Sequence, residues 1–476
     1  MAFKQDLAER LEKHGQGHLL RSWDDLDDAG REALAAEVAS IDFDHLSRLV
    51  AELVKGEGAR AEVDTDRVRP IDVVRMPQTD AERADRRRAT EAGEEALAAG
   101  EVGVVVVAGG SGTRLGFPGP KGTFPIGPVS SASLFQIHAE KVVALGRRYG
   151  KQPPLYVMTS HENHDATVRF FEEHDRFGLD HVRFFVQGRM PAVDLATGAV
   201  LLAGPGQVAM SPDGHGGTLA ALAAPGGEGC KPSCLDEMGD RGVRTLFYFQ
   251  VDNPMVEIAD PTFIGLHRRA DAEMSLKVIE KLAPDEKVGV VVDVDGRPQI
   301  IEYSDLPRPL AEARNEEGQL AYWAGSIAIH VLERSFVQRL VGVHRLPFHR
   351  AVKKVPYLGE AGELVRPAEP NAVKFEQFIF DALPEARGYV VVETDRAVEF
   401  EPLKNAVGPD SPATVHQRMS DLFGSWLEQA GAVVPRRPDG TVPFAVEISP
   451  LFALDAHELK GKVEPGTTIE RPIYLR

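Results

Sequence analysis

Residues 102–122 read VGVVVVAGGSGTRLGFPGPKG, an apolar run that leads directly into a loop rich in glycine. The run over 102–107 is almost entirely valine, which predicts a buried β-strand. From Gly109 onward, six glycines surround one arginine, Arg114, and one lysine, Lys121. Glycine lets a backbone approach a phosphate closely and point its N–H groups at it. The stretch therefore predicts a strand that ends in an anion-binding loop.

Two familiar phosphate-binding loops do not fit this sequence. A Walker A loop needs glycine immediately before its lysine, but Pro120 precedes Lys121. A dinucleotide loop that began at Gly110 and Gly112 would need a third glycine where Leu115 stands. Because an arginine can bind two phosphate oxygens at once, the loop suits a polyphosphate. The alternative is a glycine-rich turn with solvated cations.

Short apolar runs alternate with stretches of helical spacing after residue 101. The predicted strands are 102–107, 154–160, 182–187 and 245–253, and the helices between them include 133–150 and 163–174. This order predicts an α/β fold with a Rossmann-like, mixed but mostly parallel sheet covered on both faces. Ligands of such sheets bind at the carboxyl ends of the strands, where the glycine loop lies.

The chain is long enough for two or three domains. Helical spacing dominates the first 98 residues, where Ser22 or Asp24 could cap a helix and Gly100 could end one. A charge-rich link over 63–78 should be extended. We predict a helical N-terminal region (1–98), a catalytic domain (99–400) and a small C-terminal lobe (401–476).

Composition narrows the class of protein. The 476 residues carry a net charge of −18, which opposes general attraction to nucleic acids or anionic membranes. No run approaches the length of a membrane helix, and the charged N-terminus lacks an apolar signal core. The two cysteines, Cys230 and Cys234, fit neither a redox pair nor a zinc site and predict free thiols. We therefore expect a cytoplasmic protein.

The glycine loop and seven later blocks resemble the eukaryotic-type UDP-sugar pyrophosphorylases, in that family's order. The resemblance is closest to the UDP-N-acetylhexosamine pyrophosphorylases and spans about residues 15–460. The later blocks are MTS (158–160), SPDGHGG (211–217), VDN (251–253), IEYSDL (301–306), NAVKFEQFIFD (371–381), FEPLKNA (400–406) and EISPL (447–451). The resemblance implies a nucleotide-diphospho-sugar transferase fold and a reaction of UTP with a sugar 1-phosphate that releases pyrophosphate.

The same resemblance implies a role for each matched residue. Catalytic cations would be Arg114, Lys121, Lys374 and Lys404. Nucleotide contacts would come from Gly109, Gly110, Gly112, Thr113, Met158, Thr159, Ser160, Gln187, Gly214 and His215. Sugar contacts would come from Gly289, Glu302, Ser326, Phe378 and Phe380. Asp252 would hold Mg²⁺, with Mn²⁺ as an alternative, because a triphosphate needs its charge neutralised.

The sugar is less firmly indicated than the reaction. His215 and Ser326 stand where the N-acetylhexosamine group usually has asparagine, and a serine at 326 loses at least one direct amide contact. Phe378 and Phe380 instead resemble the aromatic pair of the N-acetyl pocket, although that spacing also suits plain core. We expect N-acetylglucosamine 1-phosphate, with glucose 1-phosphate or relaxed specificity as the alternative.

Three other classes of protein remain as alternatives. A nicotinamide-dependent dehydrogenase has a similar order of elements but needs the glycine pattern that is missing here. A non-catalytic sugar-nucleotide sensor would be expected to lack part of the cation set. A protein-interaction module in the first 98 residues could coexist with an enzyme. The sequence gives no indication of the oligomeric state.

Overall fold

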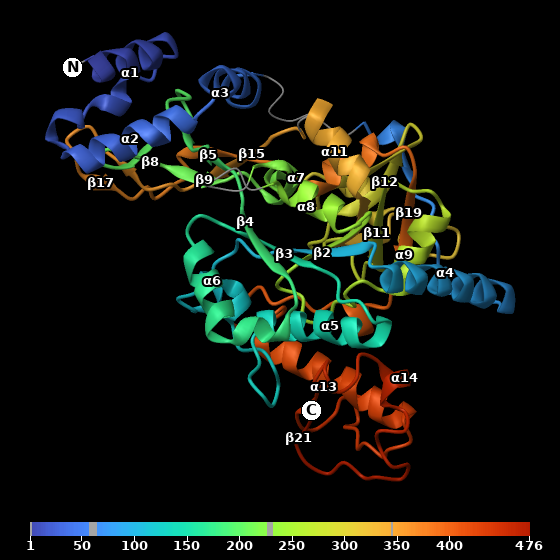
Figure 1. The fold of residues 1–476 in the computed structure, drawn as a ribbon. Helices are drawn as coiled ribbons and strands as arrows, with labels where there is room; N and C mark the ends of the chain where they lie inside the picture. The colour runs from blue at the N-terminus through green and yellow to red at the C-terminus, as the bar shows by residue number, and fades with distance from the viewer. Residues whose placement is uncertain (1, 57–63, 226–231, 344–345) are drawn as a thin grey trace. The chain divides into compact units, whose positions relative to one another are not determined.

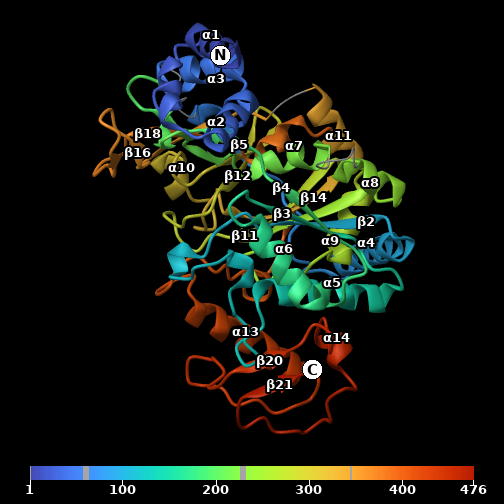
Figure 2. The ribbon, with the colours of Figure 1, turned by 60° about the vertical axis from the view of Figure 1, so that its left-hand side comes forward.

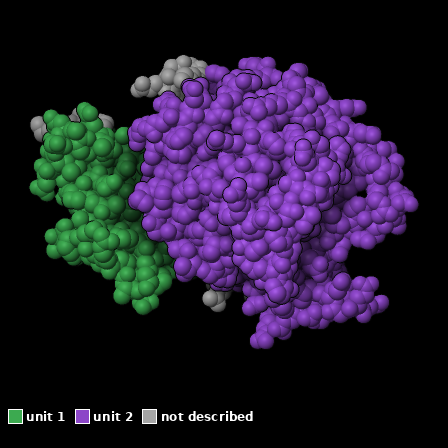
Figure 3. Space-filling model, turned by 90° about the horizontal axis from the view of Figure 1, so that it is seen from below, with its two compact units in different colours: residues 1–63, 187–220, 345–381 green, residues 64–186, 221–344, 382–476 purple. Residues whose placement is uncertain are grey.

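The computed structural model describes residues 2–56, 64–225, 232–343 and 346–476, and its contacts divide the chain into two compact units (Figure 3). Unit 1 contains residues 1–63, 187–220 and 345–381, and unit 2 contains residues 64–186, 221–344 and 382–476. Each unit is thus assembled from segments far apart in the sequence. The division predicted at 98/99 and 400/401 is not decided by this grouping and stays a prediction.

Unit 2 holds the large sheet and most of the long helices (Figures 1 and 2). Its strands are β1 (Val68–Pro70), β2 (Val102–Val107), β3 (Leu155–Thr159), β4 (Val182–Val186), β10 (Thr245–Gln250), β11 (Met274–Glu280), β12 (Val290–Val294), β13 (Arg297–Ile301), β14 (Ala324–Glu333), β19 (Tyr389–Glu393), β20 (Val446–Ile448) and β21 (Ile473–Leu475). Its α-helices are α4 (Asp80–Ala99), α5 (Leu134–Tyr149), α6 (His164–Glu173), α8 (Cys234–Asp240), α9 (Pro261–Arg269), α10 (Arg308–Glu312), α11 (Arg334–Val343), α12 (Arg396–Glu399), α13 (Pro412–Gln429) and α14 (Ala456–Leu459). Short 3-10 turns, labelled η, occupy η5 (Thr65–Arg67), η6 (Thr113–Leu115), η7 (Lys121–Thr123) and η8 (Asp175–Gly178).

The large sheet is mixed, with a parallel half and an antiparallel half. Its strands follow the order β1-β12-β14-β10-β2-β3-β4, and β11, β13 and β19 attach beside this path. The pairs β10–β2, β2–β3 and β3–β4 are parallel, whereas β14 runs antiparallel to both β10 and β11. The four strands predicted from the sequence therefore form the parallel half, and the predicted α/β fold class is confirmed.

The parallel strands are buried because helices cover both faces of this half of the sheet. Five of the six residues of β2 are buried, as its continuous valines predicted. Residues of α5 and α13 share one hydrophobic cluster with β2, β3 and β10. Figures 1 and 2 show α5 alongside the strands and α13 with α14 beyond it. The C-terminal lobe of β20, β21 and α14 has a second small core against α13.

Local signals set the ends of the long helices. Thr79 and Glu82 form a reciprocal capping box at the start of α4, and Gly100 ends that helix in the left-handed conformation with φ 77°. The prediction for Gly100 is confirmed. Ser133 caps α5 by accepting from the backbone N–H of Gln136. The 64–78 link contributes β1, which pairs with β12.

Unit 1 combines the N-terminal helices with several short strands. Its elements are α1 (Ala2–Lys13), η1 (Gly17–Leu20), η2 (Trp23–Asp25), α2 (Asp28–Ser40), α3 (Phe43–Leu49), the π-turn η3 (Val50–Val54), β5 (Arg189–Pro191), β6 (Val193–Asp194), β7 (Leu202–Gly204), β8 (Gln207–Val208), β9 (Met210–Pro212), η9 (His215–Gly217), β15 (His349–Lys353), β16 (Tyr357–Leu358), β17 (Leu364–Val365) and β18 (Ala372–Glu376). Two further elements, α7 (Thr218–Ala223) and η10 (Ile379–Glu385), run across a unit boundary of the chain.

The N-terminal helices pack on the three-stranded sheet β15-β18-β6 rather than forming a separate body. Val373 and Phe375 of β18 belong to the same buried cluster as side chains of α1, α2 and α3. The predicted helix cap at Ser22 or Asp24 is wrong. Asp27 caps α2 instead, by accepting from the N–H of Gly30, because the preceding residues form the separate turn η2.

Two further expectations can be compared with the structure. Cys234 is a buried free thiol, and Cys230 lies outside the described residues. Across the described ranges, every helix is too short or too polar to cross a membrane.

A buried ion cluster lies in the core of unit 2. The Nζ atom of Lys277, on β11, is 2.8 Å from Asp260 Oδ2 and 2.6 Å from Glu399 Oε2. All three side chains are at least nine-tenths buried. Burial alone would lower the pKa of Lys277, but the two carboxylates raise it overall. The cluster therefore ties β11 to α12 and to the start of α9.

We predict that Lys277→Met destabilises the protein strongly, because it leaves two buried carboxylates without their cation. Loss of one partner of a buried pair costs about 3–5 kcal/mol of unfolding free energy. Urea unfolding followed by circular dichroism would measure the loss. The exposed pair of Arg308 and Glu312, 2.8 Å apart, gives the control, since Arg308→Met should cost less than about 1 kcal/mol. Equal losses in the two variants would contradict the assignment.

Candidate active site

The glycine loop after β2 closes on itself and leaves its first part open. The backbone N–H of Gly112 donates to Gly119 O over 2.8 Å, and that of Lys121 donates to Gly110 O over 3.0 Å. Gly110 is exposed, and no atom lies within 4 Å of the place its Cβ would occupy. Gly109 is half-buried, and Thr113 is exposed beside Ser111. The loop thus presents uncrowded backbone at the carboxyl end of a parallel strand.

Arg114 lies in η6 on the exposed part of this loop. Within the described ranges, no hydrogen bond or ion pair engages its guanidinium. The turn after it is made by Gly116, which has φ 68°. Arg114 is therefore a cation held by its backbone and available to an anionic ligand.

Lys121 joins the glycine loop to two other segments. Its Nζ lies 3.3 Å from Asp252 Oδ2 and donates to Leu403 O over 3.2 Å. The side chains of Lys121 and Asp252 are only 18% and 15% exposed. The backbone N–H of Leu403 in turn donates to Asp252 O over 2.8 Å. The structure thus brings together Lys121, Asp252 and the segment that carries Lys404.

Lys404 follows this contact along the chain. Its Nζ lies 4.0 Å from Asp410 Oδ2 and 5.9 Å from the centre of the Phe400 ring. Its side chain is 41% exposed, so the pairing with Asp410 is weak. Burial raises the pKa of Asp410 and Lys404 partly opposes this. Lys404 could therefore turn to a stronger anion at small cost.

The MTS block forms the end of β3, next to the glycine loop. Met158 and Thr159 are fully buried, and Met158 O accepts from the N–H of Ala108 over 2.8 Å. The Thr159 hydroxyl is occupied, since it donates to Phe185 O over 3.2 Å and lies 2.8 Å from His164 Nδ1. A nucleotide would therefore meet the backbone of Thr159 rather than its hydroxyl.

Asn163 fixes the geometry of this region and was not predicted from the sequence. Its Oδ1 accepts from the N–H of Ser160 over 2.8 Å, and its Nδ2 donates to Ala108 O over 2.9 Å. The side chain thus links the ends of β2 and β3. An asparagine four residues after a strand end could have suggested such a bridge, because this residue type bonds readily to nearby backbone.

The three sugar-side residues of unit 2 lie together. The N–H of Ser326 donates to Gly289 O over 2.8 Å. A Cβ placed on Gly289 would lie 3.2 Å from Glu302 Oε1 and 2.8 Å from Ile300 Cγ2, so a side chain at 289 would crowd the carboxylate. The pairing of β14 with β11 is irregular just beyond Ser326, where Ala328 has φ 57°. Glycine at 289 therefore avoids a side chain that would crowd the Glu302 carboxylate.

Gln187 and Gly214 are joined within unit 1. Gln187 Nε2 donates to Gly214 O over 2.6 Å, and the Gln187 side chain is buried. Gly214 has φ 85°, and a Cβ there would overlap Gln377 O. Only glycine therefore fits this turn. Because Nε2 of Gln187 donates to Gly214 O, one of its N–H groups is occupied, while Oε1 can still accept a hydrogen bond from a ligand.

His215, Phe378 and Phe380 form a ring stack in unit 1. The ring of His215 lies 5.4 Å from that of Phe378 and 5.7 Å from that of Phe380, and the two phenylalanines lie 5.0 Å apart. Burial, followed by nearby His349, lowers the pKa of His215 to about 4. His215 is therefore neutral at pH 7, and its Nδ1 accepts from the N–H of Ile379 over 3.2 Å.

Lys374 lies on β18 between two buried residues. Val373 and Phe375 point into the cluster of the N-terminal helices, so Lys374 projects from the opposite face of the strand. No hydrogen bond or ion pair to its side chain occurs in the part of unit 1 that the structure describes. The N-terminal helices thus back the strand that presents this cation.

Asp213 is the second residue that sequence analysis missed. It is 9% exposed, and its Oδ1 has no hydrogen-bond partner within the described chain. A Cβ on Gly188 or Gly217 would overlap its carboxylate. Burial raises the pKa of Asp213 to about 6, and a hydrogen bond from Gln187 partly opposes this. Gly217, at the end of the SPDGHGG block, was a local signal that a side chain needs its space, whereas Gly188 lies far upstream in the sequence.

We predict that Asp213→Asn raises thermal stability more at pH 8 than at pH 4. The folded-state pKa is about 6, above the ordinary 3.8, so the wild type loses stability as pH rises through this window. A pKa of about 6 in place of the ordinary 3.8 corresponds to about 3 kcal/mol of unfolding free energy at high pH. Differential scanning calorimetry at the two pH values would measure it, with the exposed Asp25→Asn as control. A gain that is independent of pH would contradict the assignment.

Comparisons with known proteins agree with this geometry. Residues 43–426 match the family described as UTP–glucose-1-phosphate uridylyltransferase. The chain is 37% identical to the UDP-N-acetylhexosamine pyrophosphorylase-like protein 1 of Homo sapiens, over all of this chain and 97% of that protein. It is 35% identical to the UDP-N-acetylglucosamine pyrophosphorylase of Saccharomyces cerevisiae, over 96% of this chain and 98% of that one.

A solved structure of a sugar-nucleotide pyrophosphorylase is also similar to this chain. The uridine diphosphate N-acetylglucosamine pyrophosphorylase of Trypanosoma brucei, in complex with an inhibitor, superposes with a TM-score of 0.82 and 27% identity. The match covers 99% of both chains. By the span of the family match and the identity to full-length relatives, the chain belongs to the UTP–glucose-1-phosphate uridylyltransferase family.

Proposed function

We propose that the protein joins UTP to N-acetylglucosamine 1-phosphate and releases UDP-N-acetylglucosamine and pyrophosphate. The observation that carries this proposal is the contact of Lys121 with Asp252 beside an open glycine loop. Relatives that match the chain over nearly its whole length carry the name of this activity. Within the cell, we propose a cytoplasmic enzyme.

In this reaction the protein must position the two substrates and place positive charge beside their phosphates. An oxygen of the sugar phosphate attacks the α-phosphorus of UTP in line, and the bond from that phosphorus to the β-phosphate bridging oxygen breaks. Pyrophosphate leaves with the electron pair, and no proton has to move because the attacking phosphate is already anionic. Rate therefore depends on cations placed where charge gathers.

Each cation has a proposed part in this scheme. Arg114, exposed and without a protein partner in the described chain, would bind the leaving pyrophosphate with the backbone of Gly109, Gly110, Gly112 and Thr113. Lys121 would bind the α-phosphate. Lys404 and Lys374 would bind the sugar phosphate. Uridine contacts would come from Met158, Thr159, Ser160, Gln187, Gly214 and His215.

Magnesium fits this chain as a metal held largely by substrate. No group of three potential ligand side chains occurs in the ranges that the structure describes. Mg²⁺ is commonly bound by one or two carboxylates together with substrate phosphates, so Asp252 alone is a sufficient protein ligand. When bound, the ion would neutralise charge on the triphosphate, and Mn²⁺ could replace it.

Sugar selection would depend on the group of Gly289, Glu302 and Ser326, with the ring pair of Phe378 and Phe380 at an N-acetyl group. The carboxylate of Glu302 can accept from two hydroxyls, and Gly289 places no side chain against it. Glucose 1-phosphate is the second candidate because Ser326 offers a short hydroxyl in place of an amide.

We expect pyrophosphate release to be fastest with N-acetylglucosamine 1-phosphate in a panel that includes N-acetylgalactosamine, glucose and galactose 1-phosphates. The assay uses the full chain, UTP and Mg²⁺, with an EDTA-treated sample that should lose activity. Preference for glucose 1-phosphate would favour the second candidate. Absence of release with every sugar phosphate would overturn the catalytic proposal.

Lys121→Met should lower kcat by about 10²–10³-fold, since a preorganised charge that meets a developing anion typically contributes this much. Its thermal unfolding temperature should change little, because the contact with Asp252 is long, at 3.3 Å, and therefore weak. Lys460→Met, at an exposed position of the C-terminal lobe, is the matched control and should keep full activity. A kcat within threefold of wild type would contradict the role of Lys121.

A further inference from the structure

The turn after β10 carries Asp252 and, directly after it, Asn253, a residue that the proposed mechanism does not use. Asn253 lies beyond the end of β10 at Gln250 and is 5% exposed. A buried amide that has left water needs hydrogen bonds within the protein, since an unpaired one is costly. The partners of this amide therefore show which part of the chain is held against the turn.

The Asn253 amide bonds on both of its sides to the segment that leaves α12. Its Nδ2 donates to Glu399 O over 2.8 Å, and its Oδ1 accepts from the N–H of Glu401 over 3.3 Å. These partners are two positions apart, which is the spacing at which a residue in a parallel ladder bonds to its neighbouring strand. The side-chain amide thus pairs with residues 399–401 as a peptide group of a strand would.

The segment that begins at Glu399 leads directly to Lys404. Its start is anchored, because the Glu399 carboxylate lies 2.6 Å from Lys277 Nζ in the buried ion cluster. Further along, the N–H of Leu403 donates to Asp252 O over 2.8 Å, which adds a backbone bond to those of the amide. Lys404 follows at once, with a side chain that is 41% exposed. The position of its ammonium group thus depends on how the segment lies against the turn.

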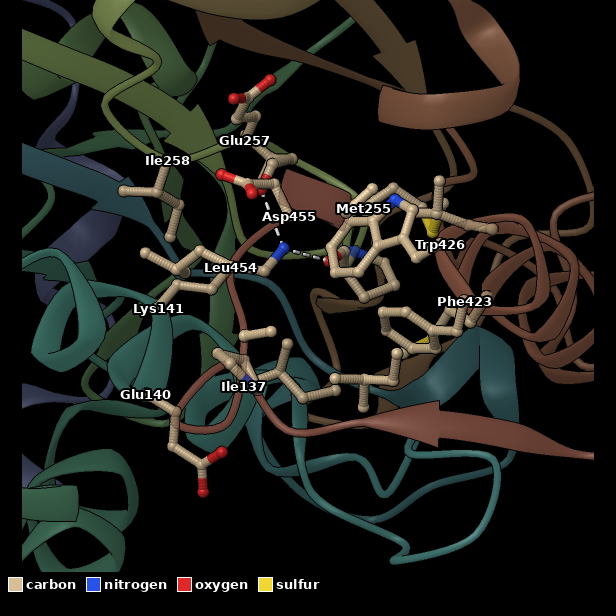
Figure 4. A pocket seen from close by; sticks show the side chains of 18 of the residues that line it. Ile137, Glu140, Lys141, Met255, Glu257, Ile258, Phe423, Trp426, Leu454 and Asp455 are labelled. Carbon is tan, nitrogen blue, oxygen red and sulfur yellow. Dashed lines mark hydrogen bonds between the residues drawn. The ribbon is translucent and has the colours of Figure 1, made fainter. Parts of the chain in front are cut away.

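The turn is the fixed side of this contact, because α5 holds it. Lys141 Nζ donates to Pro254 O over 2.6 Å and to Val256 O over 2.8 Å, as Figure 4 shows within a pocket that the turn borders. His138, on the same helix, lies 2.9 Å from Val251 O. The turn is thus held on both sides of its asparagine. Loss of the amide bonds would therefore move residues 400–404 rather than the turn.

We propose that Asn253 is a positioning residue that places Lys404 for the phosphate of the sugar substrate, a role that rests on the proposed function. A primary amide is needed because one atom must donate to Glu399 O while the other accepts from the N–H of Glu401. An aspartate would keep the acceptor but would set a carboxylate oxygen against Glu399 O, and neither of these atoms can donate. Asn253 acts through Lys404 and takes no part in the chemistry itself.

Asn253→Asp should lower kcat about 10–10²-fold, because misplacing a catalytic group by about 1 Å costs up to this much. The KM for UTP should change less than about threefold, since the glycine loop with Arg114 keeps its place. The unfolding temperature should fall by no more than about 5 °C, as one buried bond is lost from a large protein. Asn315→Asp is the matched control and should keep full activity, because its exposed Oδ1 accepts from the N–H groups of Glu317 and Gln319, bonds that a carboxylate retains.

Asn253→Ala separates positioning from the effect of an added charge. It removes both amide bonds and brings no second carboxylate next to Asp252, so kcat should again fall at least about tenfold. Full activity in the alanine variant would show that the aspartate variant acts by its charge and would overturn the proposal. Failure of either variant to fold at room temperature would overturn it too, because the amide would then hold the whole unit rather than one segment.

A double-mutant cycle tests the path through Lys404. Asn253→Asp should cost less than about threefold in kcat when Lys404 is already methionine, because the group that it positions is then missing. In an Arg114→Met background the same change should cost its full factor, since Arg114 lies on the separate glycine loop. Equal costs in the two backgrounds would overturn the assignment to Lys404.

Amide hydrogen exchange tests the same contact without the reaction. In Asn253→Ala the backbone amides of Glu401 and Leu403 should exchange at least about tenfold faster than in the wild type, while those of α5 should not change. Unchanged exchange at these two amides would overturn the positioning role even in an active enzyme. If no sugar phosphate releases pyrophosphate, the proposed function fails, whereas the exchange measurement still decides whether the amide holds the segment.

Discussion

The parallel pairing of β10 with β2 is the constraint on which the site of unit 2 depends. Residues 245–250 pair in register with 102–107, and the ladder continues as Val251 donates to Val107 O over 3.0 Å. Parallel strands end at the same edge, so the glycine loop and the VDN turn must emerge side by side. The contact of Lys121 with Asp252 follows from this register. A slip of one residue would reverse the faces of the strand and separate the two side chains.

Helix α5 holds this edge in place from beneath. His138 and Lys141 are three residues apart, so they lie on one face of the helix and both reach the turn after β10. Burial, followed by the nearby charge of Lys141, lowers the pKa of His138 to about 3, so the ring is neutral and can donate one N–H to Val251 O. Burial also lowers the pKa of Lys141, to about 8. A cation retained in such a place indicates that its bonds to the turn offset the cost of burying it.

The sequence allowed correct predictions for structural features that depend on a few neighbouring residues. It did not predict features that depend on residues far apart in the chain. The valines of β2 and the left-handed Gly100 carry their signals within a few residues, and both predictions are confirmed. The glycine loop could likewise be predicted from the sequence, because six glycines lie close together in it. Asp213, by contrast, is special only because Gly188 and Gly217 leave space for it in the fold, and one of these glycines is distant in sequence. The helix cap was placed wrongly because several acidic and hydroxyl residues compete before α2, and backbone geometry alone selects Asp27.

The geometry of Lys121 suits a residue that must change partners. Its bonds to Asp252 Oδ2 and Leu403 O are 3.3 and 3.2 Å long, at the weak end for an ammonium donor. A tighter and fully buried ion pair, such as that of Lys277 with Asp260 and Glu399, would lose several kcal/mol if a substrate drew the ammonium away. These two lysine–carboxylate arrangements of unit 2 thus have opposite consequences. The short bonds of Lys277 fix the core, while the long bonds of Lys121 keep a cation oriented toward the sheet edge and free to meet a phosphate.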